Sequence, residues 1–142
     1  MSAIEDGSAE ARRRVCRIAS KADLVLARRV GRDLAQEAGL SRTDQALLAA
    51  AISELGRNIL SYAGEGRMQL GPTAPPRRGV EVIAIDQGPG IADLALALQD
   101  GYSTGGGLGL GLPGTRRISD EFEIRSKPGQ GVWIRIVKRA SA

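Results

Sequence analysis

Two long helical patterns follow one another in the first half of the chain. Ser20 begins a sequence typical of a capping box, and apolar residues then recur at helical spacing until Gly39. Ser41 begins a second, longer pattern, whose apolar stripe continues towards Gly64. Because helices and strands therefore do not alternate strictly along the chain, we expect a mixed sheet that is covered by helices on one face.

Five segments are predicted to form the strands of this sheet. The β-branched run at 80–85 ends at Asp86 and a glycine-proline turn, which is typical of a central strand. The other predicted strands cover residues 12–19, 67–70, 121–126 and 131–139. Shorter helices are expected at 91–99 and 110–119, with a glycine-rich lid at 101–107 between them. The predicted fold class is α+β, a two-layer α/β sandwich with a mixed five-stranded sheet.

The length of 142 residues suits one compact domain, which we place at residues 11–142. Residues 1–10 are small, polar and acidic without periodicity, and we expect them to form a flexible N-terminal arm. No apolar run approaches the roughly 18 to 20 residues that a membrane span needs, and residues 1–20 lack the pattern of a signal peptide. We therefore expect a cytoplasmic protein without membrane contact.

The sequence contains no histidine, which excludes several kinds of site. Catalytic triads with histidine, HExxH zinc sites and a phosphohistidine relay are ruled out, so acid–base chemistry must rely on a carboxylate or a lysine. The formal net charge is +4, and the densest basic cluster consists of Arg12, Arg13, Arg14 and Arg17. Because no aromatic residues are interleaved with these arginines, a nucleic-acid partner is disfavoured relative to an arginine-rich surface that faces solvent or an acidic protein.

Glu54 and Asn58 lie four residues apart on the second predicted helix, and therefore on one face of it, next to the apolar stripe. A Mg²⁺ ion bound to a triphosphate already has anionic ligands, so the neutral carboxamide of Asn58 could complete its coordination. Glu54, one turn away, could take a proton from an attacking hydroxyl. Taken alone, however, the spacing favours an ordinary polar pair at a helix edge.

Asp86 and two glycines, Gly88 and Gly90, follow the predicted central strand. A carboxylate fixed there can accept a hydrogen bond from the exocyclic amine of adenine, and the glycines allow the base to approach the backbone closely. A tight turn after a strand gives the same pattern. The segment is therefore a weak signal by itself.

A third element is the glycine-rich run at 105–114, which contains six glycines. Its backbone amides can hold phosphates where a helix begins. The run matches GxGxxG at 109–114, but no strand leads directly into it, as a dinucleotide-binding unit requires. A flexible linker is the alternative, although Leu108, Leu110 and Leu112 alternate with glycine in a way that suggests packed residues.

Together and in this order, the three elements are more specific than any one of them. ExxxN at 54–58, DxGxG at 86–90 and GxGLGL at 107–112 resemble the N, G1 and G2 boxes of the Bergerat (GHKL) ATP-binding fold. Within that superfamily the chain is similar to the RsbT-type switch kinases of the bacterial stressosome, over roughly residues 15–138. The stretches that carry this resemblance are 44–46, 51–59, 62–64, 86–91, 100–104, 106–109, 111–114 and 120–122.

This resemblance implies an ATP-dependent serine/threonine protein kinase with ATP and Mg²⁺ as cofactors. Its substrate would be a STAS-domain antagonist, and once released from it the kinase would bind an effector such as a PP2C-type phosphatase. Position by position, the resemblance makes Glu54 the catalytic base, Asn58 the magnesium ligand and Asp86 the residue that recognises adenine. The other cofactor-binding residues that it implies are Gly88, Gly90, Ser103, Thr104, Gly107, Leu108, Gly109 and Gly111.

One position departs from the family pattern. Such proteins usually have threonine after the glycine of the last turn, but here Val132 follows Gly131. The missing hydroxyl would remove a water-mediated contact near the adenine and weaken nucleotide binding. The sequence therefore leaves open a second function, that of a non-catalytic, nucleotide-gated module that sequesters a partner in the manner of an anti-sigma factor.

Overall fold

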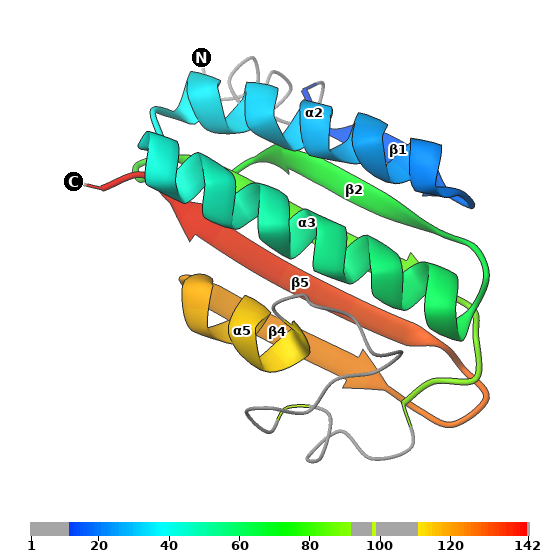
Figure 1. Ribbon diagram of the computed structural model, residues 1–142. Coiled ribbons are helices and arrows are strands. Elements are labelled where there is room, and N and C mark those ends of the chain that lie inside the picture. The colour runs from blue at the N-terminus through cyan, green and yellow to red at the C-terminus, as the bar shows by residue number, and fades with distance from the viewer. Residues whose placement is uncertain (1–11, 92–97, 99–110, 142) are drawn as a thin grey trace.

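The computed structural model describes residues 12–91, 98 and 111–141. The predicted N-terminal arm lies outside these residues, as do the predicted lid and nearly all of the predicted helix at 91–99. The described residues form a five-stranded sheet with three helices (Figure 1). This arrangement confirms the predicted two-layer α+β fold.

The two long helices begin and end close to where the sequence predicts. Helix α2 covers Lys21–Ala38, and α3 covers Arg42–Tyr62. The hydroxyls of Ser20 and Ser41 accept hydrogen bonds from the backbone amides three residues later, at 3.3 and 3.1 Å, as N-cap side chains do. The third helix, α5, covers Gly111–Ile118. In the described part of the chain, no helix has the length and apolar character to cross a membrane.

The sheet has the strand order β1-β2-β3-β5-β4, with β3 at the centre as predicted. The strands are β1, Arg14–Ile18; β2, Gly66–Pro72; β3, Gly79–Asp86; β4, Glu121–Ser126; and β5, Val132–Arg139. All four pairings between these strands are antiparallel. The prediction of a mixed sheet is therefore wrong on this one point.

The connections between the strands explain the antiparallel sheet. Two consecutive helices, α2 and α3, connect β1 to β2, so the chain reverses its direction three times and returns antiparallel to β1. Strands β3 and β4 run in the same direction, but β5 lies between them and pairs antiparallel with both. A mixed sheet would need two parallel strands as neighbours, and the insertion of β5 prevents this.

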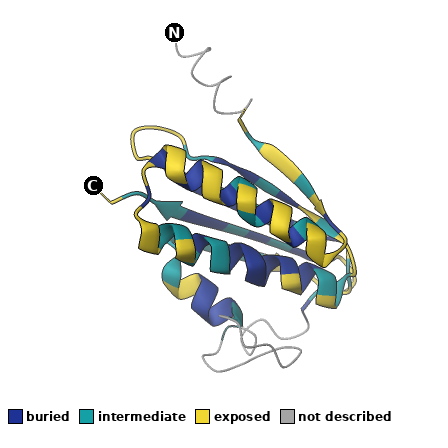
Figure 2. Cartoon of the chain, turned by 45° about the horizontal axis from the view of Figure 1, so that its top comes forward, coloured by how far each residue is buried: buried dark blue, intermediate teal, exposed yellow. Residues whose placement is uncertain are grey.

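All three helices pack against the same face of the sheet, which we call the covered face (Figures 1 and 2). Successive residues of a strand point to opposite faces, so every second residue is buried beneath the helices. On β3 these are Val80, Val82 and Ala84, which are at most 3% exposed. The other buried apolar strand residues of this face are Ile18, Met68, Leu70, Val132, Ile134 and Ile136. The core therefore lies between the helices and the sheet.

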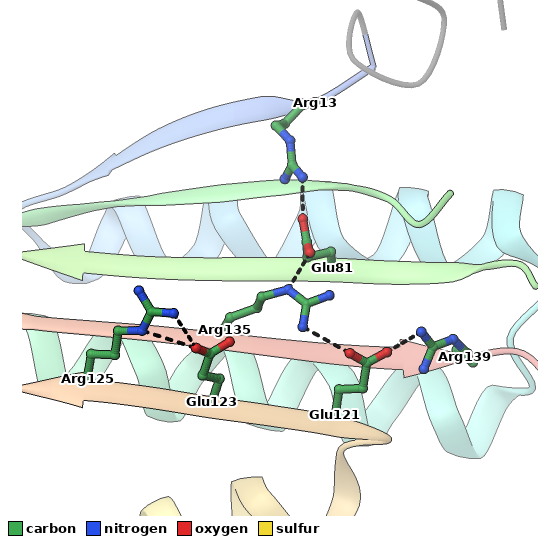
Figure 3. A network of polar contacts seen from close by, with 7 residues as sticks. All are labelled: Arg13, Glu81, Glu121, Glu123, Arg125, Arg135 and Arg139. Atoms are coloured by element: carbon green, nitrogen blue, oxygen red, sulfur yellow. Dashed lines mark hydrogen bonds and ion pairs between the residues drawn. The ribbon is translucent and has the colours of Figure 1, made fainter. Parts of the chain in front are cut away.

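The opposite face of the sheet, which we call the open face, carries many charged residues. A chain of ion pairs links Arg13, Glu81, Arg135, Glu121 and Arg139 across the strands (Figure 3). Arg135 donates to Glu81 at 2.6 Å and to Glu121 at 3.0 Å. Hydrogen bonds from Arg139 and Arg135 hold the pKa of Glu121 below its ordinary value.

The basic cluster near the N-terminus is largely paired with carboxylates. The pairs are Arg12 with Glu37, Arg13 with Glu81 and Arg17 with Glu65. Much of the positive charge of this cluster is therefore offset by nearby carboxylates. The disfavoured nucleic-acid partner stays a prediction.

Candidate functional site

Helix α3 buries three polar residues in its second half, and two of them, Glu54 and Asn58, belong to the predicted site. They are 9% and 8% exposed, whereas the third, Ser53, accepts a hydrogen bond from Arg28. Their spacing of four residues places them on the same side, where Leu55 and Ile59 continue the apolar stripe into the core. Buried polar groups are costly unless they have partners, so the contacts of these two side chains indicate what they do.

Glu54 has an ion-pair partner on its own helix. Arg57, one turn later, donates from Nη2 to Oε2 of Glu54 at 2.7 Å. The guanidinium of Arg57 is about half exposed, whereas the carboxylate of Glu54 is almost entirely buried. Glu54 therefore keeps a compensated negative charge at the edge of the core, and its partner is on the solvent side, where it can move away without disturbing the core.

Asn58 has a buried polar atom without a partner. Its Nδ2 is inaccessible to solvent and makes no hydrogen bond with the described residues. An unpaired buried amide group typically costs about 1–3 kcal/mol, so such groups are rare without a reason. A magnesium–nucleotide ligand fits this observation, because the amide oxygen can coordinate the metal while the amide nitrogen donates to a phosphate oxygen.

Asp86 ends the central strand on the covered face and is 5% exposed. Its Oδ1 accepts a hydrogen bond from the backbone amide of Gly88 at 2.9 Å. Burial raises the pKa of Asp86 above its ordinary value, and hydrogen bonds from the backbone amides of Gly88 and Val132 offset part of this effect. The Asp86 carboxylate is thus held in place, is shielded from solvent and still has capacity to accept hydrogen bonds. Such a group is suited to accept a hydrogen bond from a bound ligand.

The glycines after Asp86 allow close packing between the end of β3 and helix α3. A methyl group added at Gly88 would lie 2.7 Å from Cβ of Ala63, which directly follows the helix. At Gly66, which pairs with Asp86, an added methyl group would lie 2.8 Å from Ile59 and 3.1 Å from Cβ of Asp86. The second half of α3 and the end of β3 therefore lie at the same edge of the covered face.

Gly90 and the turn between β4 and β5 complete this edge. A methyl group at Gly90 would lie 2.6 Å from the backbone oxygen of Lys127, and the residue has a positive φ of 82°. The hydroxyl of Ser126 accepts a hydrogen bond from the amide of Ile91 at 2.7 Å. The segment from Asp86 to Ile91 is thus fixed between the end of α3 and the turn before β5.

Val132 lies opposite Asp86 in the register of β3 and β5 and is 6% exposed. Its side chain is on the covered face, and it is the residue that was predicted to depart from the family pattern. The structure therefore places this residue opposite Asp86, the predicted adenine-recognising residue. A hydroxyl at this position would lie next to Asp86, whereas the valine methyl groups cannot form hydrogen bonds.

The glycine-rich element is described only from Gly111 onwards. Gly111 is the first residue of α5, has a φ of 67°, and accepts a hydrogen bond through its carbonyl from the hydroxyl of Thr115 at 2.9 Å. Helix α5 packs against α3, so its N-terminus is at the same side of the sheet as the end of α3. The predicted site residues Ser103, Thr104, Gly107, Leu108 and Gly109 lie outside the described residues.

Sequence analysis missed three residues that shape this edge. Arg57 is the ion-pair partner of Glu54, Ser126 holds the turn after Asp86, and Thr115 is completely buried in the middle of α5. Only Arg57 had a sequence signal, because a residue three positions after Glu54 lies on the same side of a helix. Ser126 is distant from Ile91 along the chain, so its role depends on the fold.

Comparison with known proteins agrees with the fold and the order of the elements. Residues 18–138 match the model of the histidine kinase-like ATPase domain. The chain is also 47% identical over 123 residues to the serine/threonine-protein kinase RsbT of Bacillus subtilis (strain 168). That match covers 86% of this chain and 92% of the relative. This chain therefore belongs to the histidine kinase-like ATPase domain family, within its RsbT-type serine/threonine-protein kinases.

Proposed function

We propose that this kinase transfers the γ-phosphate of ATP to a serine or threonine of a STAS-domain protein, as one component of a partner-switching circuit. The observation that carries the proposal is the burial of Glu54, Asn58 and Asp86 at one edge of the covered face. Such a concentration of incompletely satisfied polar groups at the edge of an apolar core is typical of a binding site.

In the proposed complex, Asp86 accepts a hydrogen bond from the adenine amine. Gly88 and Gly90 are proposed to let the base approach the backbone, although in the structure the space of their missing Cβ atoms is taken by Ala63 and by the backbone of Lys127. Asn58 holds the magnesium ion. When bound, Mg-ATP supplies the phosphoryl group and the charge neutralisation that its transfer requires.

Glu54 is proposed to accept the proton of the attacking hydroxyl. Arg57 holds its carboxylate in place through a hydrogen bond of 2.7 Å, and a general base has to be positioned in this way. Because Arg57 is half exposed, it can also turn towards the developing negative charge on the phosphate, which would leave Glu54 free to take the proton. Burial excludes water from Glu54, which favours transfer to a protein hydroxyl over hydrolysis.

The phosphates are proposed to lie against the N-terminus of α5. Gly111 begins this helix, and its neighbours supply backbone amides with the favourable end of the helix dipole. Ser103, Thr104, Gly107, Leu108 and Gly109 remain predicted contacts to the same phosphates. We also place the circuit in the cytoplasm and propose that the kinase released from its substrate binds a PP2C-type phosphatase.

Two substitutions on α3 test this assignment. Glu54→Gln keeps the shape of the side chain, so it should lower phosphate transfer to a STAS-domain substrate by about 100- to 10,000-fold while Mg-ATP still binds. Asn58→Ala should instead weaken Mg-ATP binding, by roughly 10-fold or more. Transfer is measured with labelled ATP, and binding is measured by calorimetry.

The matched control is Glu65→Gln, which removes an exposed carboxylate close to the end of the same helix. It should leave both transfer and binding unchanged. If the Glu54 variant transferred phosphate at the normal rate, Glu54 would not be the base. If the Asn58 variant bound Mg-ATP normally, the metal would be held elsewhere.

A non-catalytic function is supported by Val132. Its side chain is buried beside Asp86 and cannot provide the hydroxyl expected at this position, so nucleotide binding would be weaker. A module that sequesters its partner and releases it according to the bound nucleotide would require no transfer. The same labelling experiment distinguishes the two functions, because such a module leaves the STAS-domain protein unlabelled.

A further inference from the structure

The open face of the sheet contains a row of residues that neither the nucleotide site nor the ion-pair chain uses. In the register of the five strands, Arg17, Arg67, Ile85, Trp133 and Arg125 follow one another directly from β1 to β4. We call this row the basic-aromatic row. It lies at the end of the sheet where β3 finishes, whereas most of the ion-pair chain of Figure 3 lies towards the other end.

The middle of the row is apolar and accessible. Ile85 and Trp133 are only partly buried, and in the next row Ile83 is also partly buried while Val15 is 64% exposed. A hollow of about 230 Å³ lies at the end of the row, where Ile85, Trp133 and Arg125 meet polar residues of the adjoining turns and Asp86. This volume is below the roughly 300–1,000 Å³ of small-molecule sites, so it suits one side chain of a partner protein.

Both ends of the row are positively charged. Arg17 and Arg67 lie at one end, and Arg125 lies at the other, with its guanidinium 4.9 Å from the centre of the Trp133 ring. Arg17 and Arg125 pair with Glu65 and Glu123, but their side chains are 76% and 73% exposed, so these pairs are weak and easily exchanged. Within the described residues, Arg67 has no ion-pair partner.

This arrangement has the characteristics of a protein-docking surface. Tryptophan and arginine are enriched among residues that dominate binding energy, and an apolar centre with a charged rim is the usual anatomy of an interface. Strands lie about 4.8 Å apart, so five of them span roughly 19 Å. A partner helix covers that distance with about 13 residues.

We propose that the basic-aromatic row docks an acidic helical segment of a partner protein, with apolar residues in its middle and carboxylates at both ends. The apolar residues contact Ile85 and Trp133, and one side chain of the segment enters the hollow. The carboxylates pair with Arg67 on one side and Arg125 on the other. A second copy of this chain is disfavoured because two such rows would repel each other. This surface is on the face opposite Glu54, so the proposal does not depend on phosphate transfer.

Trp133 is the single tryptophan of the chain and therefore reports directly on this surface. The probe is a synthetic, tryptophan-free peptide of about 13 residues, with two glutamates at each end and leucines at helical spacing between them. Titrating it into the full chain should change the fluorescence of Trp133 in a saturable way. Because the contact is partly ionic, added salt should weaken it.

The test variant is Arg67→Glu combined with Arg125→Glu, and calorimetry gives its affinity independently of any change in fluorescence. It should weaken peptide binding by about tenfold or more. The matched control is Arg29→Glu with Arg32→Glu, which makes the same charge change at exposed positions of α2, on the other side of the sheet. This control should bind the peptide like the unmodified chain. Thermal unfolding checks that both variants are folded.

Four results would overturn the proposal. The first is no saturable binding of the peptide up to about 1 mM. The second is equal weakening by the two double variants, which would show attraction to overall charge only. The third is tighter binding of a short DNA duplex through the same arginines, and the fourth is dimerisation through this face, seen by sedimentation and abolished by the test variant.

Discussion

The covered and open faces of the same sheet use polar residues in opposite ways. On the covered face the polar residues are few, and Asn58 Nδ2 is buried without a partner. On the open face the charged residues are numerous, and most are linked in a chain of ion pairs. This difference shows how the two kinds of residue can be told apart. A buried polar group without a hydrogen-bond partner indicates a ligand site, whereas charged residues that pair with one another indicate a structural role.

One atom tests this distinction within the described residues. Arg13 Nη1, on the open face, is also buried without a partner. The same guanidinium, however, pairs through Nη2 with Glu81, so its charge is compensated. Asn58 Nδ2, by contrast, makes no hydrogen bond with any residue that the structure describes. Both atoms are buried, but their situations differ. The guanidinium of Arg13 has a partner through its other nitrogen, whereas the amide nitrogen of Asn58 has none among the described residues.

The largest expected effect concerns apolar packing. Ile134 on β5 is 2% exposed on the covered face, so Ile134→Ala should lower the free energy of unfolding by about 2–5 kcal/mol. Ile83→Ala makes the same change on the open face, where the side chain is only partly buried, and should cost clearly less. Urea denaturation measures both. Equal losses of unfolding free energy would mean that the open face forms a second apolar core, which would contradict the contrast between the two faces.

A smaller effect is expected in the ion-pair chain. Glu81 is 16% exposed and accepts hydrogen bonds from Arg13 and Arg135, so Glu81→Gln leaves two partly buried guanidinium groups poorly compensated. The expected loss is about 1–3 kcal/mol of unfolding free energy. The control is Glu37→Gln, whose pair with Arg12 is half exposed and should contribute less than about 1 kcal/mol.

A double variant separates pairing from packing. Glu81→Gln together with Arg13→Met removes both charges of this ion pair. The double variant should therefore lose less unfolding free energy than the two single variants lose in sum. Additive costs would show that the two residues act independently. In that case the chain drawn in Figure 3 would be a set of separate contacts rather than one network.

Local features of this fold were accessible from the sequence. The N-cap serines, the β-branched run of β3 and Gly39 at the end of α2 depend on neighbouring residues, and these predictions were confirmed. Helix α3 has Ala63 as its C-cap, one residue before Gly64. The direction of the sheet was not accessible, because it depends on β5 inserting between β3 and β4. That pairing joins segments far apart along the chain, and local patterns do not specify it.

The site could be predicted in part for the same reason. The spacing of Glu54 and Asn58 fixes their common side of a helix, but their burial depends on how α3 lies on the sheet. The contact of Gly88 with Ala63 could not be predicted, since it requires the end of β3 to meet the end of α3. Alternation also indicates that Glu81 and Arg135 face the same way, but not that they pair, because pairing requires the register of β3 and β5.

The smallest expected effect concerns two carboxylates, one on each face. Burial raises the pKa of Asp86, whereas hydrogen bonds from Arg139 and Arg135 lower the pKa of Glu121. NMR titration of the carboxyl carbons should therefore place Asp86 above its ordinary value of 3.8 and Glu121 below its ordinary value of 4.5. Shifts of the same sign would contradict the contrast between the faces.

The two carboxylates should also change stability with pH in opposite directions. Folded Asp86 binds its proton more tightly than the unfolded chain does, so its contribution to stability should increase as the pH falls from its raised pKa towards 3.8. The contribution of Glu121 is present above 4.5 and is lost as the pH falls through its lowered pKa. Thermal unfolding of Asp86→Asn and Glu121→Gln against the unmodified chain measures each difference. In the proposed role of Asp86, an ionised carboxylate accepts from the adenine amine more strongly than its protonated form, so Mg-ATP affinity of the unmodified chain should decrease over the range in which Asp86 gains its proton, whereas that of the asparagine variant should not follow this titration.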